Sequence, residues 1–128
     1  MDGVNFRAKK GDLTVLIGKI GSGKSSLLYS LLGDMRIKDL KKTSVVVNGT
    51  VGFLSQNPWL INGTVKENIL LDKDLDPKKF SWAVKYSALD HDIKIWDEKE
   101  DHFIGENGAA LSGGQKARIA LARCLYQE

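Results

Sequence analysis

Short apolar runs in the first part of this chain give way to apolar residues at helical spacing, and the pattern predicts an α/β fold. Leu13-Thr14-Val15-Leu16-Ile17 follows the turn residues Lys10-Gly11-Asp12 and is almost entirely apolar. Such a run is typical of a strand that a parallel sheet buries on both faces. Apolar residues three and four positions apart then predict a helix over Lys24–Leu32, with Gly33 as its stop.

A β-hairpin is expected next. The runs Thr43–Val47 and Thr50–Leu54 are rich in β-forming residues and flank Asn48-Gly49. Both turn residues tolerate a positive φ, so this dipeptide between two such runs is a strong hairpin signal. The hairpin would belong to an antiparallel β portion of the fold.

The second half of the chain is helical in character. Thr64-Val65-Lys66-Glu67 has the spacing of a capping box, and Asp76-Pro77 should open a helix that reaches about Leu89. The charged, glycine-punctuated stretch 98–108 is expected to be a loop. A last helix should run from about residue 114 to residue 126.

Composition narrows the classes of function. The 128 residues are 42% hydrophobic and 27% charged, which fits one globular domain rather than a disordered chain. The net charge of +3 suits a small anionic ligand. We expect no nucleic-acid partner, because no basic stripe with interleaved aromatic residues is present. No apolar run reaches the ~18 residues that a membrane-spanning helix needs.

The single cysteine, Cys124, excludes an internal disulfide. We expect it to be a packed thiol rather than a reactive one. This expectation follows from its place on one apolar face of the last helix, which should contain Ala117, Ala120, Leu121 and Cys124.

Residues 18–25 carry the clearest chemical motif. The sequence Gly-Lys-Ile-Gly-Ser-Gly-Lys-Ser fits G-x-x-x-x-G-K-[ST] and lies between the expected strand and the expected helix, as the motif requires. Glycines let backbone N–H groups close around a phosphate, and the positive end of the helix dipole adds to the attraction. Lys24 can then reach the β- and γ-phosphates of a nucleotide, and the Ser25 hydroxyl can bind Mg²⁺. The residues expected to hold the nucleotide are Gly18, Gly21, Ser22, Gly23, Lys24, Ser25 and Ser26.

A second anion-binding helix start is expected at residues 111–115, Leu-Ser-Gly-Gly-Gln. Ser112 is a candidate N-cap, and the two glycines after it expose backbone N–H groups where the last helix begins. An ordinary helix cap would explain the same residues. A chance occurrence of the whole pentapeptide is rare at ordinary residue frequencies, however.

These residues resemble a known family. Leu111–Gln115 matches the LSGGQ signature of the ATP-binding cassette (ABC) family, and Lys116–Arg123 is similar to the helix that follows it there. Val51–Leu70 resembles the Q-loop region of the C subfamily, the multidrug-resistance-associated type, and is closer to the first of its two nucleotide-binding domains. Ile104–Gly108 also fits. The resemblance implies a P-loop NTPase core with an antiparallel β portion and an ABC helical subdomain.

The resemblance also implies roles for individual residues. Gln56 would be the Q-loop glutamine, near Mg²⁺ and the attacking water, and Ser25 would bind the same Mg²⁺. By itself, a glutamine at such a place is more often a plain hydrogen-bonding residue. Four residues would contact an ATP that a second ABC nucleotide-binding domain holds: Ser112, Gly113, Gly114 and Gln115.

Some positions depart from the family pattern. Many relatives have proline where this chain has Lys19 and Ser55, but neither position needs a particular side chain for ATP binding. The aromatic residue that stacks on adenine is expected upstream of the chain, since Phe6 is too close to the loop. The Walker B Asp, the catalytic Glu and the switch His would follow Glu128. We therefore expect a fold that is incomplete at both ends, and a chain that by itself is poorly soluble and hydrolyses no ATP.

We expect residues 1–63 to form the P-loop core and β portion, residues 64–111 the helical subdomain, and residues 112–128 the signature helix. The parent protein would be an ATP-hydrolysing membrane exporter, with transmembrane domains as partners and this domain on the cytoplasmic face. Two alternatives stay open. A soluble ABC ATPase would lack neighbouring transmembrane domains, and a non-hydrolysing regulatory domain that binds ATP would lack the catalytic Glu.

Three short motifs receive ordinary interpretations. The sequons at 48–50 and 62–64 are interpreted as turns, because a P-loop domain works on cytosolic ATP. Asp90-His91-Asp92 has no second cluster that would complete a metal site. We therefore expect His91 and His102 to be surface or packing residues.

Overall fold

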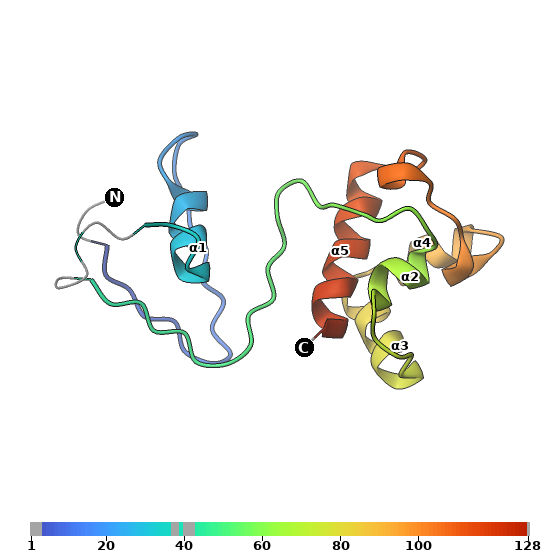
Figure 1. The fold of residues 1–128 in the computed structure, drawn as a ribbon, viewed down its shortest axis with the longest axis horizontal. Coiled ribbons are helices and arrows are strands. Elements are labelled where there is room, and N and C mark those ends of the chain that lie inside the picture. The colour runs from blue at the N-terminus through green and yellow to red at the C-terminus, as the bar shows by residue number, and fades with distance from the viewer. Residues whose placement is uncertain (1–3, 37–38, 40–42, 128) are drawn as a thin grey trace. The chain divides into compact units, whose positions relative to one another are not determined.

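The computed structural model describes residues 4–36, 39 and 43–127, and the chain divides into two units, Met1–Gly49 and Thr50–Glu128. Helices labelled α1 to α5 in Figure 1 and two short 3₁₀ helices make up the described secondary structure. Their bounds are α1 Lys24–Leu32, α2 Val65–Leu70, α3 Pro77–Tyr86, α4 Asp90–Ile95, η1 Lys99–Asp101, η2 Glu106–Gly108 and α5 Gly113–Gln127.

In the first unit, α1 has the bounds that the sequence predicted. Gly23 at its N-cap and Gly33 at its C-cap both adopt left-handed conformations, with φ of 91° and 84°. The Asp34 N–H donates to the Tyr29 carbonyl at 2.9 Å, which satisfies an end carbonyl of the helix. No residue of α1 is buried, so the two glycines rather than packing set its limits.

The strand predicted at residues 13–17 is wrong for this structure. The segment is irregular, and Leu13 and Ile17 are 91% and 90% exposed instead of buried on both faces. A strand exists only through hydrogen bonds to a neighbouring strand. No other segment within the described residues supplies such a partner to 13–17.

The predicted hairpin around Asn48-Gly49 is also not formed. Gly49 has the expected positive φ, 111°, but neither flanking run is a strand. A lone two-stranded hairpin is marginal in water unless its apolar face packs on something. Within the described residues, the only β pairing is an isolated antiparallel bridge between Thr64 and Phe103. The antiparallel β portion of the predicted fold is therefore not present among them.

The second unit packs around α5, which lies against α2 and α3 (Figure 1). One apolar cluster fills the space between these helices and the loops that join them. Its buried members are Leu60, Val65, Ile69, Ala83, Val84, Leu89, Ile104, Leu111, Ile119, Ala122 and Tyr126. No helix among the described residues is long and apolar enough to span a bilayer.

Local capping chemistry starts α2 and α3 where the sequence predicted. The Glu67 N–H donates to Thr64 Oγ1 at 3.1 Å, and the Thr64 N–H donates to Glu67 Oε2 at 2.7 Å, which completes the capping box. Asp76 caps α3, and Pro77 occupies its first position. The helix ends at Tyr86, before the predicted Leu89, and the separate helix α4 follows it.

The last helix was predicted well in extent but not in orientation. It begins at Gly113 and ends at Gln127. Of the four residues expected on its apolar face, only Ala120 is buried, while Ala117, Leu121 and Cys124 are half-buried. The buried face instead contains Ile119, Ala120, Ala122, Arg123 and Tyr126. The stretch 98–108 is a loop with the two 3₁₀ turns η1 and η2.

Candidate functional site

The loop before α1 is shaped by glycines in the left-handed region. Gly21 and Gly23 have φ of 78° and 91°, which a residue with a side chain rarely adopts. The Ser22 N–H donates to the Lys19 carbonyl at 3.2 Å and tightens the turn. The sequence thus places flexible residues where the backbone must reverse.

Lys24 closes this loop with its own side chain. Its Nζ donates to the carbonyls of Gly18 and Lys19, both at 2.9 Å. An ammonium group has three N–H donors, and two of them are used here. The only positive charge in the first turn of α1 is thus held against the loop that precedes the helix.

The same loop fits an anion and a divalent cation. The backbone N–H groups of residues 23–26 donate no hydrogen bond within the described part of the chain, and such a row of N–H groups attracts an anion. A β-carbon at Gly18 would lie 2.8 Å from Ser22 Oγ, so a side chain there would crowd the loop. Ser25 is exposed, and no described group is bonded to its hydroxyl.

A reciprocal cap starts α5 in the second unit. The Gln115 N–H donates to Ser112 Oγ at 3.2 Å, and the Ser112 N–H donates to Gln115 Oε1 at 2.9 Å. This confirms Ser112 as the N-cap. The N–H groups of Gly113 and Gly114 have no acceptor in the described structure, and both residues are exposed.

The Gln115 side chain continues into an ion pair that the sequence analysis missed. Its Nε2 donates to Asp92 Oδ1 at 3.3 Å. Arg118 binds the same carboxylate with two groups, Nε at 2.6 Å and Nη2 at 3.0 Å. The Arg118 hydrogen bonds lower the pKa of Asp92, and the Asp92 carboxylate raises the pKa of Arg118. The sequence pattern does not indicate this role of Asp92, because Arg118 lies 26 positions away along the chain.

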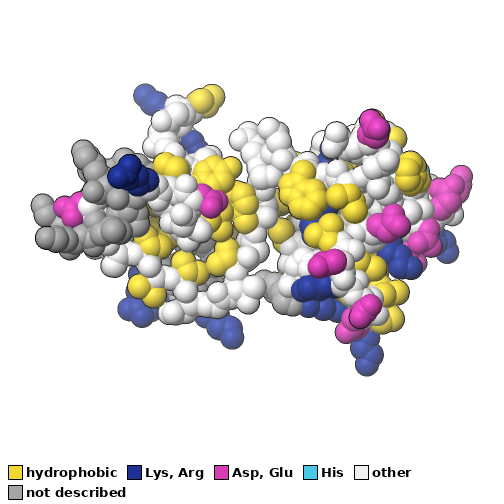
Figure 2. All heavy atoms as spheres, in the orientation of Figure 1, with side chains coloured by type: hydrophobic (Ala, Val, Ile, Leu, Met, Phe, Trp, Pro, Cys, Tyr) yellow, Lys and Arg dark blue, Asp and Glu magenta, His cyan; other side chains and the backbone are white. Residues whose placement is uncertain are grey.

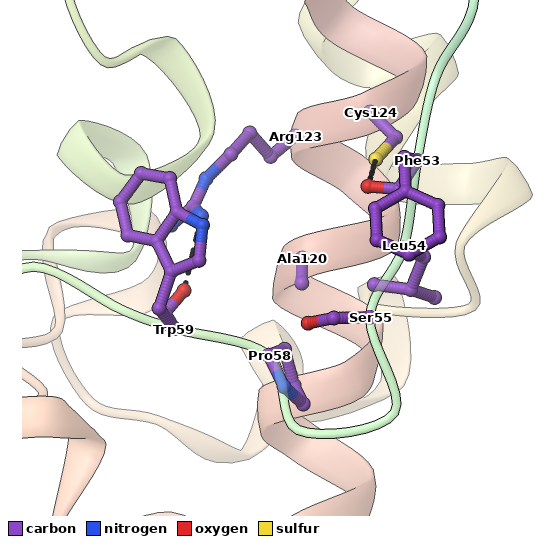
Figure 3. Close-up of a pocket in the computed structure, with 8 residues that line it drawn as sticks. All are labelled: Phe53, Leu54, Ser55, Pro58, Trp59, Ala120, Arg123 and Cys124. Atoms are coloured by element: carbon purple, nitrogen blue, oxygen red, sulfur yellow. Dashed lines mark hydrogen bonds between the residues drawn. The ribbon is translucent and has the colours of Figure 1, made fainter. Parts of the chain in front are cut away.

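Gln56 is exposed and lies in the second unit, and it directly follows Ser55, one of the residues that line a pocket (Figure 3). In the figure, α5 forms one wall and the segment containing Pro58 and Trp59 forms the other. The Cys124 thiol donates to the Phe53 carbonyl at 3.3 Å. The pocket is lined by Phe53, Leu54, Ser55, Pro58, Trp59, Ala120, Arg123 and Cys124.

Arg123 fixes this segment to α5. Its Nη1 donates to the Trp59 carbonyl at 3.0 Å, and its guanidinium carbon lies 4.0 Å from the centre of the Trp59 ring (Figure 3). Its other two nitrogens donate to the carbonyl and the side-chain oxygen of Asn68, at 2.7 and 3.0 Å. Burial lowers the pKa of Arg123. The sequence could have indicated this role in one way only: Arg123 is a charged residue among the mostly apolar residues that α5 buries.

The two predicted groups of site residues lie in different units. The residues at 18–26 belong to the first unit, whereas Gln56 and the residues at 112–115 belong to the second. Each of the groups 18–26 and 112–115 is brought together locally at the start of a helix.

The histidines have ordinary roles, as predicted. His91 is exposed, and His102 stacks on Trp96 with ring centres 4.8 Å apart while its Nδ1 lies 3.1 Å from Glu98 Oε2. That contact lowers the pKa of Glu98. Across the described residues, no group of three His, Cys, Asp or Glu side chains gathers as metal ligands.

Comparison with known proteins identifies relatives over the whole chain. The profile of the family described as "ABC transporter" matches residues 1–128. The chain is 47% identical over 124 residues to the metal resistance protein YCF1 of Saccharomyces cerevisiae. The matched residues make up 96% of this chain and 8% of that protein. It is 46% identical over 123 residues to ABC transporter C family member 13 of Arabidopsis thaliana, covering 96% of the chain and 8% of the relative. It is 39% identical over 128 residues to ATP-binding cassette sub-family C member 4 of Mus musculus, covering 100% of the chain and 9% of the relative.

Proposed function

The chain belongs to the ABC transporter family, and we propose that residues 18–26 bind MgATP, with Lys24 at the β- and γ-phosphates and Ser25 at Mg²⁺. Domains of this family bind ATP, usually with Mg²⁺. The observation that carries the proposal is the position of the Lys24 ammonium, which lies against the loop and donates to the carbonyls of Gly18 and Lys19. Those carbonyl acceptors are neutral, and they can be exchanged for phosphate oxygens, whose negative charge binds the ammonium more strongly.

The other loop groups support the same assignment. The N–H groups of residues 23–26 are available to phosphate oxygens, and they lie at the positive end of α1. The exposed Ser25 hydroxyl can bind the metal ion in the first turn of the helix. When bound there, Mg²⁺ would neutralise part of the negative charge of the phosphates. Gln56 would orient water and Mg²⁺ in the parent protein.

For residues 112–115, we propose contact with an ATP that a second nucleotide-binding domain holds. The open N–H groups of Gly113 and Gly114 and the exposed Ser112 support an anion contact at the start of α5. A 15-residue helix supplies the dipole. Two domains would then enclose two nucleotides, each between one domain's residues 18–26 and the other domain's residues 112–115.

The chain spans only 8–9% of the length of the relatives that it matches. We propose that the complete protein couples ATP binding and hydrolysis to export across a membrane. Transmembrane domains would be its partners, and this domain would lie on the cytoplasmic face. The names of the relatives support this proposal, since they include a transmembrane exporter from Schizosaccharomyces pombe.

The nucleotide site is tested by Lys24→Ala in the full protein that contains this chain. Because it removes charge-assisted contacts worth about 1.5–3 kcal/mol, MgATP affinity should fall roughly 10- to 150-fold. Titration calorimetry measures this change directly. Lys19→Ala is the matched control, because it removes a neighbouring loop lysine whose side chain makes no described contact. Equal affinity of the Lys24→Ala protein and the unchanged protein would refute the assignment.

A further inference from the structure

We propose that Asp92 is a positioning residue for the LSGGQ segment. It orients the Gln115 amide, which in turn orients Ser112, so that the Ser112 hydroxyl proton points to a nucleotide phosphate. The inference deepens the proposed function of residues 112–115 and rests on it. Asp92 itself lies on α4, outside the segment that would contact nucleotide.

The Asp92 carboxylate is held in place by Arg118, independently of its contact with Gln115. Asp92 is only 6% exposed. Arg118, one turn into α5, holds both of its oxygens, with Nε at 2.6 Å and Nη2 at 3.0 Å. A two-point contact between a planar guanidinium and a carboxylate fixes orientation as well as distance. Oδ1 therefore faces Gln115 from a defined position.

The carboxylate then decides which way the Gln115 amide points. An ionised carboxylate can only accept, so the amide nitrogen must face Asp92, where Nε2 lies 3.3 Å from Oδ1. The amide oxygen must face the other way, and there it accepts the Ser112 N–H at 2.9 Å. With the amide reversed, an NH₂ group would meet that N–H, and the cap would be lost.

The cap leaves one specific group of Ser112 available. Ser112 Oγ already accepts the Gln115 N–H at 3.2 Å. Its own proton has no acceptor in the described structure, so it can be donated to an anion. Ser112 thus presents a hydroxyl donor next to the open N–H groups of Gly113 and Gly114.

Arg118 also lies close to the segment that Asp92 orders. A β-carbon at Gly114 would lie 3.2 Å from Arg118 Nη1. Arg118 thus lies beside Gly114 and would have to shift by a few tenths of an ångström to admit a side chain there. The carboxylate that orients Gln115 therefore also fixes the guanidinium that lies beside Gly114.

The test compares Asp92→Asn with Asp90→Asn in the full protein. Asp90 lies on the same helix, and its one partner among the described residues is exposed Lys94, at 3.4 Å, so it controls for loss of a charge from α4. We expect Asp92→Asn to speed hydrogen exchange of the Ser112 amide and to weaken ATP-dependent pairing of the two nucleotide-binding domains about ten-fold. Its MgATP affinity at residues 18–26 should stay close to that of Asp90→Asn. Its melting temperature should be lower, because the Asp92–Arg118 ion pair is buried, so pairing is measured at a temperature at which both variants are folded.

A second variant keeps the cap acceptor but replaces the donor to Asp92 with a second carboxylate. Gln115→Glu can still accept the Ser112 N–H, but it places two carboxylates against each other. It should therefore weaken pairing as Asp92→Asn does. In the double variant D92N/Q115E, the new amide at position 92 can donate to the new carboxylate at position 115. Pairing should recover beyond that of either single variant.

The possible outcomes separate the two proposals. Unchanged Ser112 exchange in Asp92→Asn, a loss of pairing that only follows a loss of folding, or no recovery in the double variant would each overturn the positioning role. Ser112→Arg tests the segment itself, because a bulky cation there should abolish pairing while MgATP still binds. If pairing survives Ser112→Arg, the proposed contact of residues 112–115 with nucleotide is wrong, whatever Asp92 does to the Ser112 amide.

Discussion

Arg123 carries a charge into the core of the second unit, where it is only 7% exposed. Its three guanidinium nitrogens all donate, and Asn68, which receives two of these bonds, is itself fully buried. The Asn68 side chain is satisfied by further bonds to backbone groups of Ile61 and Thr64. The sequence could not identify this cluster, because its acceptors are mostly backbone carbonyls 55 to 64 positions away along the chain. The spacing of apolar residues instead predicts that alanine and leucine side chains form the buried face of this helix.

Arg123→Lys should destabilise the second unit by about 2–4 kcal/mol, because a single ammonium cannot reach three separate acceptors and leaves buried carbonyls unpaired. Urea unfolding followed by tryptophan fluorescence measures the change. Arg36→Lys is the control, since this exposed arginine lies in the first unit. A midpoint shift no larger than that of the control would mean that the buried hydrogen bonds contribute little.

At the scale of elements, the sequence predicted what local chemistry decides and failed where distant segments decide. A glycine turn precedes α1, and an Asp-Pro pair starts α3. Helices α2 and α5 each start at a side-chain cap that pairs with the residue three positions later. The strand at 13–17 needed a hydrogen-bonding neighbour that no described segment provides. The early end of α3 was not foreseen because Ala88 adopts a left-handed conformation, φ 57°, which its identity does not indicate.

The capping box of α2 offers a test at this scale. Thr64→Ala removes the acceptor for the Glu67 N–H and should cost about 1 kcal/mol of unfolding free energy. A helix of 6 residues depends strongly on its cap, because few of its hydrogen bonds lie within the helix itself. Thr64→Ser keeps the hydroxyl and should retain most of the stability in the same urea experiment. Equal losses for alanine and serine would assign the effect to the methyl group and not to the cap.

In the whole molecule, the candidate sites belong to units of very different packing. The second unit has a continuous apolar core, whereas no described residue of the first unit is buried. Hydrophobic side chains are open to solvent on both units (Figure 2), and in the first unit they include Leu13, Ile17 and Ile20. The loop at residues 18–25 and the helix after it were predictable from spacing alone, since these residues are contiguous in the sequence. The sheet that the sequence predicted around this loop is not formed by the described residues, so nothing buries the apolar segment before the loop.

The two units should therefore differ in stability when residues 1–128 are studied as an isolated chain. Amide exchange follows local opening, and segments with few buried apolar contacts open at little cost. We expect residues 4–36 to exchange at nearly unprotected rates, and α2 and α5 to exchange orders of magnitude more slowly. All three tryptophans, Trp59, Trp82 and Trp96, lie in the second unit, so a fluorescence-detected urea transition should follow the protection of α5 and not that of α1. Equal protection of α1 and α5, lost together in one cooperative transition, would show that the units stabilise each other. It would also contradict the low stability that we expect for residues 4–36 in the isolated chain.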